Sequence, residues 1–132
     1  MNPIVFLTTE DVLRIQRHLV DFYGGEGGIR DIGLLESAVA MPMSMFGGDF
    51  LHKDIHEMAA AYLFHIVQNH PFLDGNKRAG AMTAFVFLKL NRYTLTATTD
   101  EFYELVLAVA EGKTGKSEVA AFFRSHTEQR DS

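Results

Sequence analysis

The stretch His70-Pro71-Phe72-Leu73-Asp74-Gly75-Asn76-Lys77-Arg78 joins two apolar, helix-like segments, Ile55–Asn69 and Lys77–Leu90. Pro71 disfavours the helical conformation for His70, so the first helix is predicted to end there and to turn the imidazole outward. Gly75 and Asn76 adopt turn conformations at little cost, which brings backbone N–H groups together where the second helix begins. Such a helix start attracts anions, phosphates above all.

The same stretch holds the side chains that phosphate chemistry needs. Lys77 and Arg78 supply positive charge beside the helix start, and Asp74 is a carboxylate of the kind that binds Mg²⁺. A histidine side chain can accept a proton at neutral pH, so His70 is a candidate base. Phe72 is predicted to anchor the loop in the core. Together these residues predict a site for phosphoryl or nucleotidyl transfer.

These residues resemble the signature loop of the Fic/Doc superfamily, H-P-F-x-D/E-G-N-G-R-x-x-R. Every fixed position from His70 to Arg78 matches except the last glycine, where Lys77 stands, and Ala81 occupies the position of the final arginine. Both departures are typical of the Doc (death on curing) branch, the toxins of a class of toxin–antitoxin modules. The segments 23–38 and 105–123 also resemble the N-terminal region and the C-terminal helices of that branch.

Composition limits the class of protein. The chain has 132 residues, 47% hydrophobic and 22% charged, which indicates one soluble globular domain with a real core. A net charge of −5 gives no sign of a nucleic-acid partner or of binding to an anionic membrane. The absence of cysteine fits a reducing cytoplasm. The N-terminus lacks the basic start of a signal peptide, and no apolar run approaches the ~20 residues of a membrane span.

Helical periodicity predicts an all-α fold, and the resemblance implies a single-domain bundle of the Fic/Doc kind with a small flap or hairpin. Helix starts are expected at Thr8, at Asp31 or Gly33, and at Asp54, Thr98 and Ser117. The segment 79–90 is apolar on nearly every face, which predicts the buried central helix of the bundle. A short extended piece is expected at 93–96. The domain is predicted to span 1–126, with a frayed tail at 127–132.

Three other patterns have simpler interpretations. His52 and His56 could mimic a metal site with Asp54 and Glu57, but a solvated first helical turn explains them better. The sequence 112–117 ends like a phosphate-binding loop, yet the upstream glycine is missing and the preceding segment is helical, so a basic turn between helices is expected. The glycines at 24–28 are interpreted as a helix stop. Arg30 and Glu36 are expected to fix local structure, although Arg30 could reach a nucleotide.

The segment between Met41 and Lys53 is apolar but broken by glycines, which predicts a loop or small hairpin. Met41 is expected in the core. The resemblance implies that Met45, Phe46, Gly47 and Gly48 belong to a flap that binds the target peptide.

The resemblance implies an ATP-dependent enzyme that modifies a protein hydroxyl, with an antitoxin as inhibitor and elongation factor Tu as target. His70 would accept the hydroxyl proton and Asp74 would hold Mg²⁺, while phosphates would lie on a set of four residues: Gly75, Asn76, Lys77 and Arg78. Lys77 would also turn the ATP γ-phosphate toward the histidine. This favours a Ser/Thr kinase that arrests translation. An AMP transferase and a catalytically silent binding module remain the alternatives.

Overall fold

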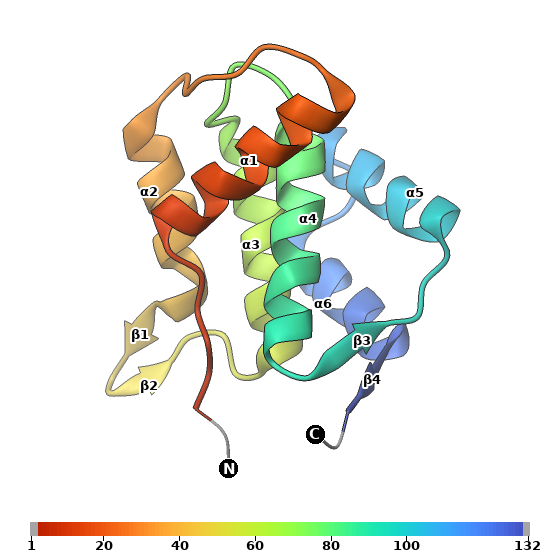
Figure 1. Cartoon of the computed structure of the whole chain (residues 1–132). Coiled ribbons are helices and arrows are strands. Elements are labelled where there is room, and N and C mark those ends of the chain that lie inside the picture. The colour runs from red at the N-terminus through yellow and green to blue at the C-terminus, as the bar shows by residue number, and fades with distance from the viewer. Residues whose placement is uncertain (1–2, 131–132) are drawn as a thin grey trace.

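The computed structural model describes residues 3–130, which form six α-helices, a 3₁₀ helix and two small sheets, each of two antiparallel strands (Figure 1). In chain order the elements are α1 (Thr9–Tyr23), α2 (Ile32–Ala40), the 3₁₀ helix (Met41–Met43), β1 (Met45–Phe46), β2 (Asp49–Phe50), α3 (Ile55–Asn69), α4 (Asn76–Leu90), β3 (Tyr93–Leu95), α5 (Thr99–Ala110), α6 (Lys116–Ser125) and β4 (Thr127–Gln129). The predicted all-α bundle is confirmed.

Side-chain caps begin most of the helices where the sequence predicts. Thr8 accepts a hydrogen bond from the backbone of Asp11 (3.1 Å), whose carboxylate accepts one from the backbone of Thr8 in return (2.8 Å). Asp54 caps α3 through the N–H of Glu57 at 2.8 Å, and Thr98 begins α5 with a box like that of α1. These contacts join residues three apart, so they form as soon as the first turn does.

The core lies around α3 and α4, the most extensively packed pair of helices. Figure 1 shows α2 to the left of this pair, α5 and α6 to the right, and α1 crossing in front of it. Tyr62 and Leu63 of α3 pack in the same buried cluster as Phe87 and Leu88 of α4. The central position is therefore shared: α4 turns Met82 and Phe85 to a cleft, whereas α3 is enclosed along most of its length.

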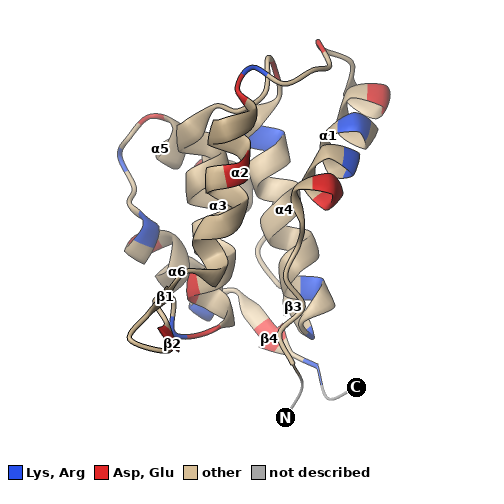
Figure 2. Ribbon diagram, turned by 90° about the vertical axis from the view of Figure 1, so that its left-hand side faces the viewer, with Lys and Arg blue, Asp and Glu red and all other residues tan. Residues whose placement is uncertain are grey.

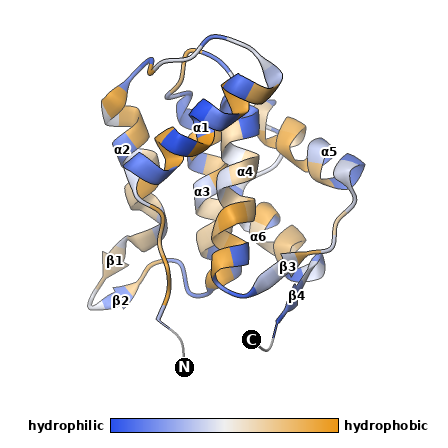
Figure 3. Cartoon of the chain, viewed as in Figure 1, coloured by the Kyte–Doolittle hydropathy of each residue, from blue (hydrophilic) through white to orange (hydrophobic). Residues whose placement is uncertain are grey.

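Charge and hydropathy follow this layering. Figure 2 shows charged residues of both signs along the outer side of α1, whereas α3 is almost free of them. Figure 3 shows hydrophobic residues along much of α2 and α4 and hydrophilic ones on the outer side of α1. Within residues 3–130, no helix has the length and apolar character that crossing a membrane requires.

The C-terminal end corrects the predicted frayed tail. Residues 127–129 form β4, which pairs with Tyr93–Leu95, and the N–H of Arg130 donates to the carbonyl of Arg92 at 2.7 Å. His56 also donates from Nε2 to the hydroxyl of Thr127 at 3.1 Å. The prediction was wrong for 127–130 because the partner strand comes from a distant part of the chain; residues 131–132 lie outside the described part.

The predicted small hairpin forms between the 3₁₀ helix and α3. Met45 pairs with Phe50 and Phe46 with Asp49, and the turn between them uses Gly47 (φ +61°) and Gly48 (φ +87°). Two consecutive residues with positive φ suit a tight hairpin turn, which glycine adopts without strain.

Candidate active site

His70 lies at the corner between α3 and α4 with its side chain exposed, as predicted. Its backbone is left-handed (φ 50°), a conformation that is uncommon outside glycine. Arg30 holds the corner by donating from Nε to the carbonyl of His70 (2.6 Å) and from Nη2 to that of Asn69 (2.9 Å). These bonds satisfy carbonyls that the end of a helix leaves open. Arg30 thus fixes local structure, and it is absent from the walls of the cleft described below.

Asn76 closes the loop from inside. Its Oδ1 accepts from the N–H of Phe72 at 2.9 Å, and its Nδ2 donates to the carbonyl of the same residue at 3.1 Å. Phe72 is 1% exposed and packs in the smaller core cluster with Leu35 and Ile66. The Asn76 amide is therefore committed to the loop, and only the backbone N–H of this residue remains for the predicted phosphate contact.

The amide also sets the proton position on His70. Because Oδ1 of Asn76 already accepts from Phe72, Nδ2 faces His70 Nδ1 at 3.1 Å and can only donate to it. In this geometry the neutral imidazole keeps its lone pair on Nδ1 and its proton on Nε2. Proton exchange with solvent can move the imidazole proton from Nε2 to Nδ1, which costs the hydrogen bond to Asn76, about 1 kcal/mol.

Asp74 follows on the exposed side of the loop. Its Oδ1 accepts from the N–H of Gly75 at 2.8 Å and its Oδ2 from the N–H of Glu26 at 3.3 Å. No group of three His, Cys, Asp or Glu side chains converges within residues 3–130. One carboxylate still fits Mg²⁺, which keeps several waters and is commonly bound by one or two carboxylates together with substrate phosphates. Asp74 would hold the ion only together with a nucleotide.

The first turn of α4 carries exposed cations and has no side-chain cap. Its N-cap, Gly75, has a left-handed backbone (φ 75°) and offers no side-chain cap. Lys77 and Arg78 are exposed in this turn, and neither forms an ion pair within the described part of the chain. Open N–H groups and free cations together suit a phosphate chain.

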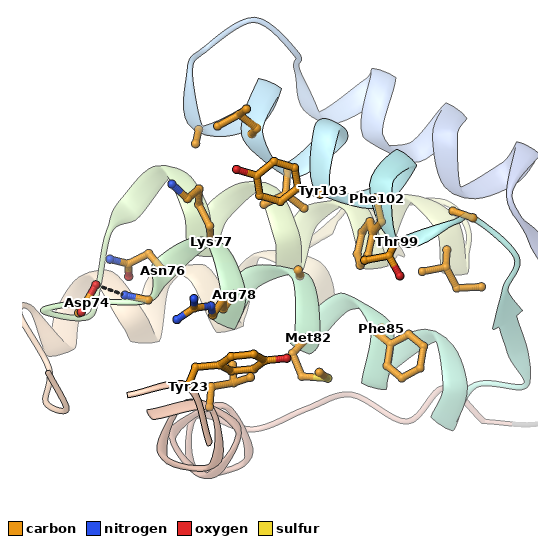
Figure 4. A pocket seen from close by; sticks show the side chains of 18 of the residues that line it. Tyr23, Asp74, Asn76, Lys77, Arg78, Met82, Phe85, Thr99, Phe102 and Tyr103 are labelled. Carbon is orange, nitrogen blue, oxygen red and sulfur yellow. Dashed lines mark hydrogen bonds between the residues drawn. The ribbon is translucent and has the colours of Figure 1, made fainter. Parts of the chain in front are cut away.

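A cleft of about 920 Å³ leads away from this turn between α1, α4 and α5. Figure 4 shows Asp74, Lys77 and Arg78 at one end and Phe85 and Phe102 toward the other. His70 and Ala81 also line it. The cleft thus joins a charged end to an apolar end, within the ~300–1,000 Å³ typical of ligand sites. Sequence reasoning missed the α1 and α5 walls because they come from distant segments.

The predicted flap does not border this cleft. The β1–β2 hairpin lies at the far end of α3 from the His70 loop (Figure 1), and a helix of 15 residues spans about 22 Å. Met45 and Phe46 are 60% and 82% exposed. In this arrangement the length of α3 separates the hairpin from the loop, and no hairpin residue lines the cleft.

The other patterns lie elsewhere. His52 is only 5% exposed, not solvated as expected, and its Nδ1 has no partner among the described residues. It lines a second cavity of about 220 Å³ with Glu57, Lys116 and Arg124. Burial, with the nearby Lys116 charge, lowers the pKa of His52. Residues 112–115 lie in the turn between α5 and α6, and Lys116, the first residue of α6, donates from Nζ to His65 Nε2 at 3.1 Å.

An exposed histidine beside an uncapped helix start, with free cations and a carboxylate, is an arrangement suited to the transfer of phosphate-linked groups. A profile described as the Fic/DOC family matches residues 6–88, which include the whole loop. The chain therefore belongs to the Fic/Doc family.

Two relatives cover most of the chain. It is 38% identical over 95 residues, 72% of this chain and 71% of the relative, to a protein named Toxin Doc from Mycolicibacterium smegmatis. It is 26% identical over 118 residues, 89% of this chain and 92% of the relative, to a protein named Protein kinase doc from Escherichia phage P1.

Proposed function

We propose that this chain is the toxin of a toxin–antitoxin module and moves the γ-phosphate of ATP to a Ser or Thr hydroxyl of a translation factor. The names of both relatives support this. The observation that carries the proposal is the exposed His70 next to an uncapped helix start with two unpaired cations at the mouth of a cleft.

In the proposed reaction the protein hydroxyl attacks the γ-phosphorus, a new O–P bond forms and the bond to the β-phosphate oxygen breaks, releasing ADP. His70 takes the hydroxyl proton. In the resting tautomer its lone pair faces Asn76, so the proton on Nε2 must first pass to Nδ1 through solvent, or the hydroxyl must displace the amide. The exposure of His70 allows either route.

Charge on the transferring group is stabilised from the first turn of α4. Lys77, Arg78 and the open N–H groups of that turn face the cleft and can bind phosphate oxygens. Asp74 would hold Mg²⁺, which supplies further charge neutralisation when bound. All of these groups act on the phosphates of ATP, and none of them needs to contact its adenine ring.

Whether the γ-phosphate or the AMP group of ATP is transferred is proposed to depend on Lys77 and Ala81. A glycine at position 77 would let a phosphate chain run close to the helix start, whereas the lysine fills that path and moves the strongest positive charge. Ala81 lines the cleft without offering a cation to the other end of the nucleotide. These two residues favour γ-phosphate transfer over AMP transfer.

The partners are proposed from the resemblance. Elongation factor Tu is the proposed target, and exposed Met45 and Phe46 are available to contact a protein of that size outside the cleft. The proposed antitoxin folds an apolar and acidic tail onto an exposed groove. The apolar half of the cleft, where Tyr103 is 58% exposed, is suited to such a tail.

Transfer of label from ATP to purified elongation factor Tu tests the proposal. Label in the γ position is expected to appear on the target, and label in the α position is not. Transfer of the α label would make the chain an AMP transferase. Absence of both labels with intact protein would favour a silent binding module.

A further inference from the structure

The segment after α1, interpreted from sequence as a mere helix stop, runs along the outside of the His70 loop. The N–H of Leu73 donates to the carbonyl of Gly28 at 3.2 Å, and Ile29 forms a β-bridge with Phe72. Nearer to α1, the N–H of Glu26 donates to Asp74. We call Tyr23–Glu26 the strap.

The first residue of the strap supports Arg78. The Tyr23 ring lies under the guanidinium, with Arg78 Cζ 4.6 Å from the ring centroid (Figure 4). Phe22 packs edge-on against the same ring, with centroids 4.8 Å apart. A guanidinium stacked on an aromatic face keeps its N–H edges free for phosphate oxygens. Tyr23 therefore restrains Arg78 without occupying its donors.

The third residue of the strap is fitted to Asp74. A Cβ on Gly25 would lie 2.8 Å from Oδ2 of Asp74, closer than real Cβ atoms approach. Gly25 also has φ +104°, a conformation that favours glycine. The absence of a side chain there lets the carboxylate rest against the strap, where the N–H of Glu26 holds it.

We propose that the strap positions both phosphate-end groups of the site from outside the loop: Tyr23 sets the guanidinium of Arg78, and Gly25 with the Glu26 N–H sets the carboxylate of Asp74. This inference rests on the proposed function, because it concerns the binding of ATP phosphates. Restraining both side chains before the ligand arrives lowers the entropy lost on binding. Tyr23 and Gly25 are positioning residues; neither has a chemical role in the reaction.

The Arg78 half is tested by calorimetric binding of a non-hydrolysable ATP analogue. Tyr23→Leu is expected to weaken binding about twofold to fivefold, the range of an exposed cation–π contact. Tyr23→Phe, which keeps the ring, is expected to bind as the unchanged protein does. His18→Ala, at an exposed position of α1, is the control. In an Arg78→Gln background, Tyr23→Leu is expected to cause no further loss, since coupled residues are not additive.

The Asp74 half uses two glycines of the strap. Gly24 and Gly25 both have positive φ, but a Cβ at Gly24 meets nothing within 4 Å. Gly24→Ala and Gly25→Ala therefore share the backbone strain, and only Gly25→Ala displaces the carboxylate. Gly25→Ala is expected to reduce the gain in analogue affinity on adding Mg²⁺ and to speed hydrogen exchange of the Glu26 amide, relative to Gly24→Ala.

Equal affinity in Tyr23→Leu and Tyr23→Phe, or equal Mg²⁺ dependence in the two alanine variants, would overturn the positioning role. The NMR signal of Arg78 Nε–Hε gives a readout independent of nucleotide: it should shift in Tyr23→Leu, where the ring is lost, and stay near its place in Tyr23→Phe. An unchanged signal in Tyr23→Leu would also overturn the role. If the unchanged protein binds the analogue but transfers no phosphate, the proposed reaction fails and the positioning role stands.

Discussion

At the scale of single residues, His70 depends on neighbours that hold it without burying it. Its left-handed backbone places the imidazole outside α3, while Arg30 binds its carbonyl and Asn76 its Nδ1. A left-handed non-glycine residue is strained by about 1 kcal/mol or more and persists only where its surroundings determine it. The strain lies at the residue proposed as the base.

His70→Ala is expected to abolish phosphate transfer and toxicity while leaving the fold intact. The side chain is exposed and makes a single hydrogen bond, so its loss should change the free energy of unfolding by about 1 kcal/mol at most. Label transfer, growth of cells that express the variant, and thermal unfolding measure the three effects. Full activity in a folded His70→Ala protein would remove His70 from the mechanism.

Lys77→Gly tests the direction of the nucleotide. The lysine is exposed in the first turn of α4 and lines the cleft, so its removal should end γ-phosphate transfer with little effect on the core. Combined with Ala81→Arg, the change is expected to give measurable AMP transfer. Transfer of γ and α labels to the same target distinguishes these results. Unchanged γ transfer in Lys77→Gly would contradict the role given to Lys77.

At the scale of elements, the crossing of α3 and α4 depends on Gly80. A Cβ there would lie 2.7 Å from Cγ2 of Val67 and 3.2 Å from the carbonyl oxygen of Leu63. The missing side chain lets the two helices pack closely, and this close packing fixes the positions of the two ends of the loop that joins them. Glycine inside a helix is otherwise unfavourable by about 1 kcal/mol relative to alanine.

Gly80→Ala is therefore expected to destabilise the protein although alanine is the better helix former. Overpacking costs about 1–3 kcal/mol, so after the gain in helix propensity a net loss of up to about 2 kcal/mol remains. Urea denaturation measures it, with Lys89→Ala as the exposed control on the same helix. A more stable Gly80→Ala protein would show that the helices can separate freely.

At the scale of the whole molecule, stability is expected to fall in mild acid. Burial, with the nearby Lys116 and then His52, lowers the pKa of His65 to about 4, and burial also lowers the pKa of His52 and of His56. These groups bind protons more readily when unfolded. Their contribution is therefore complete above the ordinary histidine pKa of about 6.5 and is lost as pH falls toward 4.

The urea midpoint should accordingly decrease between pH 7 and pH 4.5. His65→Gln should show a shallower decrease, because one of the three histidines with a lowered pKa no longer titrates, while His18→Gln on the exposed side of α1 should follow the unchanged protein. Identical slopes in all three proteins would mean that His65 does not drive the acid sensitivity.

Control of activity also belongs to the whole molecule. Self-inhibited relatives of this family carry an S/T-x-x-x-E-G/N motif, and here Glu111-Gly112 fits only its end. Position 107 is Leu107, and Ala81 stands where the arginine that such a glutamate engages would be. Glu111 instead pairs with Lys113 at 3.2 Å. The described residues contain no self-inhibitory motif of this type.

The chain expressed alone is therefore expected to stop growth, and the purified protein should transfer phosphate without activation. Growth curves compare it with His70→Ala produced at the same level. Normal growth with confirmed folded protein would contradict both the absence of self-inhibition and the toxin assignment.

The sequence by itself determined the features that neighbouring residues make together. The caps at Thr8, Asp54 and Thr98 join residues three apart, and the turn at Pro71 and Gly75 is set by the backbone limits of those two residues. Such features need no distant partner, so their positions were predictable, as were the helices between them.

Only the tertiary structure decided what distant segments do to one another. It placed Tyr23 under Arg78, covered His52, and gave the polar tail at 127–129 a strand to pair with. The contact between Tyr23 and Arg78 and the pairing of β3 with β4 each join residues more than 30 positions apart in the chain. The residue types at these positions would suit an exposed surface equally well. Whether they become buried or paired depends on which elements the packing of α3 against α4 brings near.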